Sequence, residues 1–261
     1  MKRIIVTLFA LTTFSALMSP VLAADTTNAN SVSPAERAKI EGVVHDYLLK
    51  KPEVIVEVLQ ILQRKQYEQA EQTVKQTQQS AAAFANPLFH QTNDPIGGNP
   101  NGKVTVVEFF DYQCPHCVDM APIMDSVLKA NPDVRVVYKE FPVRGPMSEF
   151  AAKAALAANK QGKYSVFSHA LLAASQPLTE DTVFQVAKNV GLNVDQLKKD
   201  MNSNDITNQV KSIMKLAQDL KLLGTPAFFI GKTMATDGTI IYSPGQMNQV
   251  QLQEAIDKAS K

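Results

Sequence analysis

The hydrophobic positions near the start of the chain recur at helical spacing. Ser33-Pro34-Ala35-Glu36 is typical of a helix start, with an N-cap Ser, a Pro at the first helical position and a Glu three residues after the cap. Pro52 ends this helix and can open a second one. We predict two short helices followed by a polar helical connector, rich in Gln, that ends near Phe84. The apolar stripe of both helices consists of Ile40, Val43, Val44, Tyr47, Leu48, Val54, Ile55, Val58, Leu59, Ile61 and Leu62.

This apolar stripe needs a partner, because about 50 residues are too few for a comfortable core of their own. One interpretation is that the stripe folds back onto its own main domain. The other is a homodimer, since the Gln run separates the stripe from the rest of the chain. We predict that residues 24–85 form a helical dimerisation region and connector.

Beyond this region the pattern changes to short β-branched and aromatic runs. Turn residues between 86 and 102 mark a domain boundary, and a second domain covers 86–261. Residues 146–222 look helical throughout, and a last helix fits 250–259. The order β-α-β, helical block, β-β-α predicts an α/β fold. Strands are expected at residues 103–110, 134–139, 227–230 and 239–242, the last two separated by a turn around Asp237-Gly238.

The first residues have the features of a secretory signal peptide. Lys2 and Arg3 precede an apolar run that is too short to span a membrane, and small residues follow at Ala23. We expect cleavage after Ala23, and therefore a mature protein exported to the periplasm, where disulfides can persist.

Composition narrows the function classes. The 261 residues include 26 Lys and Arg against 25 Asp and Glu, and 45% are hydrophobic. This balance argues against a disordered tail protein and against a basic nucleic-acid binder. Two cysteines cannot form a disulfide-dense scaffold or a four-thiolate zinc site, so they act as one pair.

Both cysteines lie in Cys114-Pro115-His116-Cys117, where a strand ends and a helix begins. At a helix N-terminus the first sulfur faces unpaired backbone N–H groups and the positive end of the helix dipole, which favour its thiolate. His116 can add a positive charge or a donor. We expect Cys114 to be the exposed, reactive thiol and Cys117, one turn later, to be the buried resolving thiol.

Two other roles for the pair are weaker. A structural disulfide that closes only four residues removes little entropy from the unfolded chain. A metal site, with monovalent copper as its best form, would need further ligands. His45, His90 and His169 have no ligand-like spacing to the pair and stay unassigned.

The segment from Val106 to Cys117, together with Gly224-Thr225-Pro226-Ala227-Phe228, resembles the exported thioredoxin-fold proteins of the DsbA type. The resemblance covers roughly residues 95–261 and implies a thioredoxin fold with an inserted helical domain. The N-terminal helices depart from monomeric DsbA. They are more similar to dimeric DsbA-like proteins, some described as surface antigens, and to the dimerisation regions of the DsbC and DsbG isomerases.

The resemblance also implies supporting residues. Glu108 occupies the position of the buried acid under the disulfide, where it would shuttle a proton for Cys117, and Lys139 would be its charge partner. The alternative is that both point to solvent at strand edges. Pro226 is expected to follow a cis bond, so that the backbone of Thr225 is exposed for pairing with a substrate chain.

These features predict a protein disulfide oxidoreductase or isomerase that acts on exported proteins containing cysteines. The exchange needs no metal or nucleotide cofactor. By analogy with the family, a membrane partner of the DsbB or DsbD type would restore its redox state. The alternative is a dimeric chaperone or binding protein for unfolded chains in which the thiols are incidental.

Overall fold

The structure is a computed structural model that describes residues 32–174, 177–234 and 239–261. The predicted signal peptide and the predicted turn at Asp237-Gly238 lie outside these residues. The chain divides into two compact units, one ending at Ile61 and the other beginning at Leu62.

The first unit contains helix α1 (Pro34–Lys50) and the beginning of α2 (Glu53–Ser80). The predicted capping box is present: the Ser33 hydroxyl accepts from the Glu36 amide at 3.3 Å, and the Glu36 carboxylate accepts from the Ser33 amide at 3.0 Å. No residue of α1 is buried. The apolar stripe is therefore without a partner within this unit, with the following side chains exposed: Ile40, Val43, Val44, Tyr47, Ile55, Val58, Leu59 and Ile61.

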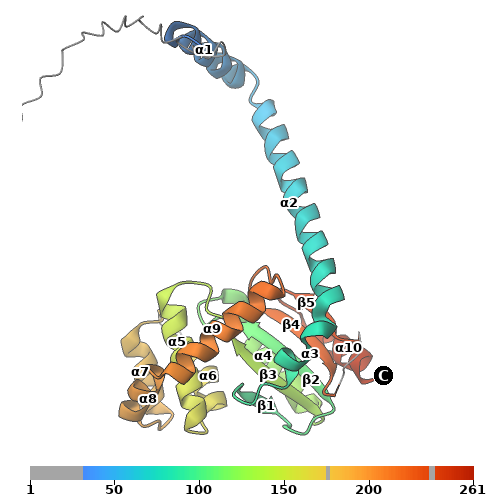
Figure 1. Cartoon of the computed structure of the whole chain (residues 1–261), viewed down its shortest axis with the longest axis vertical. Helices are drawn as coiled ribbons and strands as arrows, with labels where there is room; N and C mark the ends of the chain where they lie inside the picture. Colours follow the sequence, from blue (N-terminus) through green and yellow to red (C-terminus); the bar gives the residue numbers. More distant parts are fainter. Residues whose placement is uncertain (1–31, 175–176, 235–238) are drawn as a thin grey trace, which may run out of the picture. The chain divides into compact units, whose positions relative to one another are not determined.

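The second unit is built on a five-stranded sheet in the order β1-β3-β2-β4-β5 (Figure 1). Strands β2 and β3 are parallel, whereas the other neighbouring strands are antiparallel. Strand β1 was not predicted, because three residues that include two glycines carry no strand pattern. The strands are β1 (Ile96–Gly98), β2 (Val104–Phe110), β3 (Val134–Glu140), β4 (Ala227–Lys232) and β5 (Ile241–Pro244).

The helices of this unit follow the predicted order. Three of the N-caps are Thr179, Asn193 and Ser203, whose side chains accept from the first turn of the helix that follows. The predicted α/β fold with a helical block between β3 and β4 is confirmed. The helices are α4 (Pro115–Ala130), α5 (Pro146–Lys160), α6 (Tyr164–Leu172), α7 (Glu180–Asn189), α8 (Val194–Met201), α9 (Asn204–Asp219) and α10 (Gln249–Ser260).

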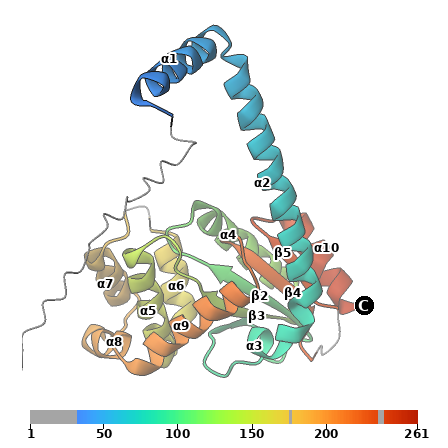
Figure 2. The ribbon, with the colours of Figure 1, turned by 45° about the horizontal axis from the view of Figure 1, so that its top comes forward.

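Each face of the sheet has its own hydrophobic core. The face formed by Val106, Phe110 and Tyr138 packs against α4, α10 and the helical block, and this core includes both cysteines. The opposite face, formed by Val107, Phe109 and their neighbours, packs against α3 (Ala85–Phe89) and the second half of α9 (Figures 1 and 2). Successive residues of β2 therefore point to different environments.

The end of the connector packs on the second unit instead of remaining solvated to Phe84. The Thr77 hydroxyl is buried and donates to the Leu220 carbonyl at 2.8 Å. Residues 81–89, which form a short 3₁₀ helix (Ala81–Phe84) and α3, contribute the buried Ala81, Leu88 and Phe89 to the second core. The boundary that the turn residues predict at residue 86 thus lies inside this core. None of the described helices is long and apolar enough to cross a membrane.

Candidate functional site

The cysteines lie at the junction of β2 and α4, as predicted. Cys114 is the N-cap of α4 and Pro115 its first residue, and Cys117 lies one turn further in. Both are present as free thiols and both are buried. Burial of Cys114, at 0% exposure, differs from the expectation of an exposed sulfur. Solvent instead meets Pro115 and His116, which are exposed beside it.

The environment of Cys114 favours its thiolate. Burial by itself raises the pKa of the thiol, but hydrogen bonds from the Thr225 side chain and from the backbone N–H groups of Cys117 and His116 outweigh this, so the pKa is lowered. The direction agrees with the prediction from the helix N-terminus.

Cys117 and Glu108 lie in the opposite electrostatic situation. Burial raises the pKa of Cys117, and the nearby charges of Cys114 and Glu108 add to this effect. Glu108 is buried in the middle of β2, and burial raises the pKa of its carboxyl to about 8. A carboxyl with that pKa can hold or release a proton near neutral pH, as its predicted role requires.

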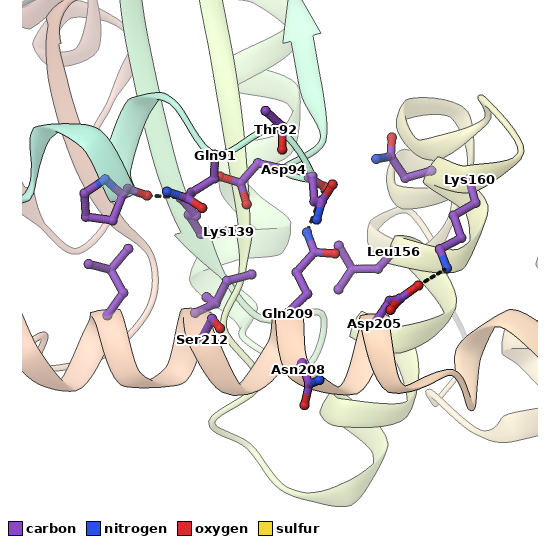
Figure 3. A pocket seen from close by; sticks show the side chains of 15 residues that line it. Gln91, Thr92, Asp94, Lys139, Leu156, Lys160, Asp205, Asn208, Gln209 and Ser212 are labelled. Carbon is purple, nitrogen blue, oxygen red and sulfur yellow. Dashed lines mark hydrogen bonds and ion pairs between the residues drawn. The ribbon is translucent and has the colours of Figure 1, made fainter.

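Lys139 is not the charge partner of Glu108. It stands opposite Phe109 in the β2–β3 pair, whereas Glu108 stands opposite Tyr138, so the two side chains point to opposite faces of the sheet. The Lys139 ammonium forms a buried ion pair with Asp94 and donates to the Pro87 carbonyl at 2.7 Å. Asp94 and Lys139 line a cavity of about 590 Å³ beside α9 (Figure 3).

The Thr225–Pro226 peptide bond is cis, as predicted from the resemblance. The Thr225 carbonyl oxygen lies 3.2 Å from Cys114 Sγ, and β4 begins at the next residue after Pro226. This loop and the N-terminus of α4 together enclose the sulfur.

The histidines have separate environments. His116 Nδ1 lies 3.2 Å from Gln246 Oε1, in the segment before α10. His169 Nε2 lies 3.5 Å from Asp125, and His45 is exposed on α1. Among the described residues, no group of three or more His, Cys, Asp or Glu could hold a metal ion.

Asp111 is a residue of the site that sequence analysis missed. Its Oδ1 accepts from the Gln113 amide and the Ser148 hydroxyl, both at 2.7 Å, and its Oδ2 accepts from the amides of Val143 and Arg144 at 2.8 and 2.9 Å. This buried carboxylate ties the segment before Cys114 to the loop before α5. In the sequence, Asp111 could have been found from its position between a buried strand and the cysteine pair, where an acidic residue needs a specific partner.

Glu140, the last residue of β3, was also missed. It is completely buried, and its Oε1 accepts from the hydroxyls of Tyr112 and Tyr164 at 2.9 and 2.8 Å. The Ser168 hydroxyl lies 2.9 Å from that of Tyr112. The Tyr112 and Tyr164 side chains of this buried polar cluster belong to the same core as the two cysteines.

Family models match two parts of the chain. Residues 105–257 match the DSBA-like thioredoxin domain, and residues 36–69 match the N-terminal domain of the copper resistance protein ScsC. The two matches correspond to the sheet-based domain and to the exposed helices before it.

Two solved structures are similar over most of their length. A thioredoxin-like oxidoreductase from Silicibacter pomeroyi DSS-3 is 43% identical, with a TM-score of 0.62, over 67% of this chain and 96% of its own. BcfH from Salmonella enterica Typhimurium is 32% identical, with a TM-score of 0.63, over 87% of this chain and 97% of its own.

Curated relatives match a little more than half of the chain. The Na(+)/H(+) antiporter NhaA 3 of Salinispora tropica is 28% identical over 52% of this chain, which spans only 21% of the antiporter. A probable disulfide bond formation protein D of Bacillus cereus is 28% identical over 58% of this chain and 76% of its own.

Proposed function

Because the chain belongs to the DSBA-like thioredoxin family, we propose that it forms and reshuffles disulfide bonds in exported proteins through Cys114 and Cys117. The observation that carries this proposal is the buried cysteine pair at the N-terminus of α4, with Thr225 against the first sulfur. The two thiols differ strongly in their tendency to ionise, as an attacking and a resolving thiol must.

In the oxidising direction the protein starts with a Cys114–Cys117 disulfide. A substrate thiolate attacks Cys114, which forms a mixed disulfide and releases Cys117. Glu108 supplies the proton that Cys117 takes up. A second substrate thiolate then attacks the substrate sulfur of the mixed disulfide, and Cys114 leaves as the stabilised thiolate. The substrate loses two electrons and the protein gains them.

In the isomerising direction the protein starts reduced. The Cys114 thiolate attacks a wrong disulfide of the substrate, and another substrate thiol later displaces Cys114, so no net oxidation occurs. If the substrate is trapped, Cys117 gives its proton to Glu108 and attacks the Cys114 sulfur. The Cys114–Cys117 disulfide forms, the mixed disulfide breaks, and the substrate leaves as a thiolate, reduced by the two electrons that the protein loses. The backbone of Thr225 would hold the substrate chain as an added strand. The reaction uses only the two cysteines as its redox group.

The family assignment and the start of the chain support export to the periplasm, with a membrane partner of the DsbB type for re-oxidation or of the DsbD type for reduction. The unpartnered apolar stripe on α1 and α2 supports self-association of copies of this chain, with a homodimer as the smallest assembly. Such an assembly would place more than one redox centre around one substrate.

The test is reactivation of ribonuclease, starting either reduced or with scrambled disulfides. The full mature chain should catalyse both reactions, and Cys114→Ser should abolish both. Cys117→Ser should accumulate mixed disulfides, because the resolving thiol is lost. A protein with both cysteines replaced by Ser that still promotes refolding would instead support a chaperone that holds unfolded chains on its apolar stripe.

A further inference from the structure

Two buried carboxyls lie on the same face of the sheet as the redox centre. In the parallel pair of β2 and β3, Glu108 stands opposite Tyr138, and Glu140 stands opposite Phe110. Opposite residues of a parallel pair share a face, as do residues two apart along a strand. Glu108 and Glu140 are therefore diagonal neighbours, with Cα atoms roughly 8 Å apart by the spacing of strands and residues.

The hydrogen bonds of Glu140 are uneven between its two oxygens. Oε1 accepts from both Tyr112 and Tyr164, whereas Oε2 is buried without a partner among the described residues. An ionised carboxylate spreads its charge over both oxygens, and a buried charged oxygen without a partner is costly. A proton on Oε2 removes the charge from this oxygen, and Oε1 then acts as the carbonyl oxygen that accepts two bonds.

In the part of the chain that the structure describes, no cation forms an ion pair with Glu140. The phenols of Tyr112 and Tyr164 and the hydroxyl of Ser168 lie in its cluster, and Asp111 and Glu108 act on it as negative charges. Among the described residues, neither Glu108 nor Glu140 has an ion pair. The pKa of Glu140 is raised to about 8. Burial is the main cause, the hydrogen bonds from the two phenols oppose it, and the charges of Asp111 and Glu108 add to it.

We propose that Glu108 and Glu140 titrate as a coupled pair in which Glu140 keeps its proton at neutral pH. Glu140 is then a positioning residue that acts through Glu108 and limits the site under Cys117 to one carboxylate charge. Like charges in a region of low dielectric oppose each other's ionisation, so the pair loses its two protons in separate steps. The effect on exchange rests on the proposed function, because it requires Glu108 to pass a proton to or from Cys117.

The first test is an infrared titration of the full chain from about pH 5 to about pH 10, which covers both carboxyls. Wild type should show protonated carboxyl absorption at neutral pH, and Glu140→Gln should remove the part of it that belongs to Glu140. In Glu108→Gln, the remaining band should titrate at a lower pH than in wild type, because the charge that opposed it is gone. Coupling is reciprocal, so Glu140→Gln should lower the midpoint of Glu108 by the same amount. Independent midpoints, or no band at neutral pH that depends on Glu140, would overturn the proposal.

The second test separates coupling from a general loosening of the core. Glu140→Gln should move the pH midpoint of Cys117 resolution downward, giving a gain of roughly two- to fivefold at neutral pH. Tyr164→Phe removes a donor that favours the ionised form of Glu140, so it should move the Glu140 band to higher pH instead. If Glu140→Gln raises the midpoint of Glu108, or Tyr164→Phe lowers the midpoint of Glu140, the effect is structural and the proposal fails. If Glu140→Gln does not fold, the titrations of Glu108→Gln and Tyr164→Phe still decide.

The infrared titration does not depend on thiol exchange. A wild type that exchanges no disulfides but loses its carboxyl protons in two coupled steps refutes the proposed function and leaves the pair intact. Active exchange with uncoupled carboxyls refutes the pair alone.

Discussion

Cys114 Sγ lies 3.2 Å from the carbonyl oxygen of Thr225, although 111 residues separate the two in the sequence. The same residue also contributes its side chain to stabilisation of the Cys114 thiolate. The segment that would hold a substrate chain therefore also sets the reactivity of the attacking sulfur. A change at Thr225 should consequently affect both binding and chemistry.

Replacing Thr225 by Val should raise the pKa of Cys114, because the hydroxyl that stabilises the thiolate is lost. The loss of one hydrogen bond corresponds to about a fivefold slower reaction of Cys114 with an alkylating agent at neutral pH. The thiolate absorbance measured against pH gives the pKa directly. Thr207→Val, on α9, is the matched control. An unchanged pKa of Cys114 would remove the Thr225 hydroxyl from this role.

Replacing Glu108 by Gln should slow proton transfer at Cys117 and lower the resolution rate by on the order of a hundredfold. Quenched-flow measurement of the mixed disulfide gives this rate. The resolution rate of wild type should increase as the pH rises towards about 8, where Glu108 ionises. The resolution rate of the variant should lack this increase. Equal rates in both proteins would remove Glu108 from the mechanism.

The same variant should alter how stability depends on pH. The folded-state pKa of Glu108 is raised from 4.5 to about 8, so its contribution is fully present below pH 4.5 and is lost as the pH rises to 8. In Glu108→Gln, the unfolding free energy should therefore fall less steeply between pH 4.5 and 8. At pH 8 it should exceed that of wild type by on the order of a few kcal/mol. Chemical denaturation across this pH range measures the effect.

Lys139 should matter for stability and not for exchange. Lys139→Ala leaves the buried Asp94 without its cation, which should cost about 3–5 kcal/mol of unfolding free energy. The pair Asp94→Asn with Lys139→Met should recover most of this loss. Rates of thiol exchange in the double variant should match wild type. A double variant that is stable but resolves the mixed disulfide more slowly through Cys117 would show that Lys139 contributes to exchange.

Gln78 should stabilise the packing of the end of α2 against the edge of the sheet. Its amide donates to the Ile240 carbonyl and accepts from the Tyr242 amide, both at 2.7 Å, so it occupies the place of a neighbouring strand. Gln78→Ala should destabilise the protein by about 1–3 kcal/mol, because two backbone groups lose their partners. Gln79→Ala, at an exposed position, is the control in the same denaturation experiment. Equal effects of the two substitutions would show that these hydrogen bonds contribute nothing.

The apolar stripe should hold copies of the chain together. Leu59→Glu places a charge in the stripe and should convert the assembly to monomers in light scattering, while oxidation of reduced ribonuclease continues. Gln60→Glu adds the same charge on the same helix and should leave the mass unchanged. The measured mass also gives the number of copies. A wild-type monomer would contradict self-association.

Local features of this protein could be predicted from the sequence because they depend on neighbouring residues. The Ser33–Glu36 capping box, the main strands, the helical block and the position of Cys114 at a helix start all follow from short-range spacing. The cis bond before Pro226 came instead from the resemblance to a family.

Other features depend on which residues meet across the sheet, and only the tertiary structure decided them. The resemblance to the family implied Lys139 as the charge partner of Glu108, but the strand register turns Lys139 to the other face, towards Asp94. The partners of Asp111 and Glu140 come from segments distant in the sequence. The sequence pattern of α3 does not indicate against which face of the sheet its apolar residues pack. Spacing along a chain determines local conformation, whereas the environment of a buried charge is set by packing between segments that the sequence pattern does not align.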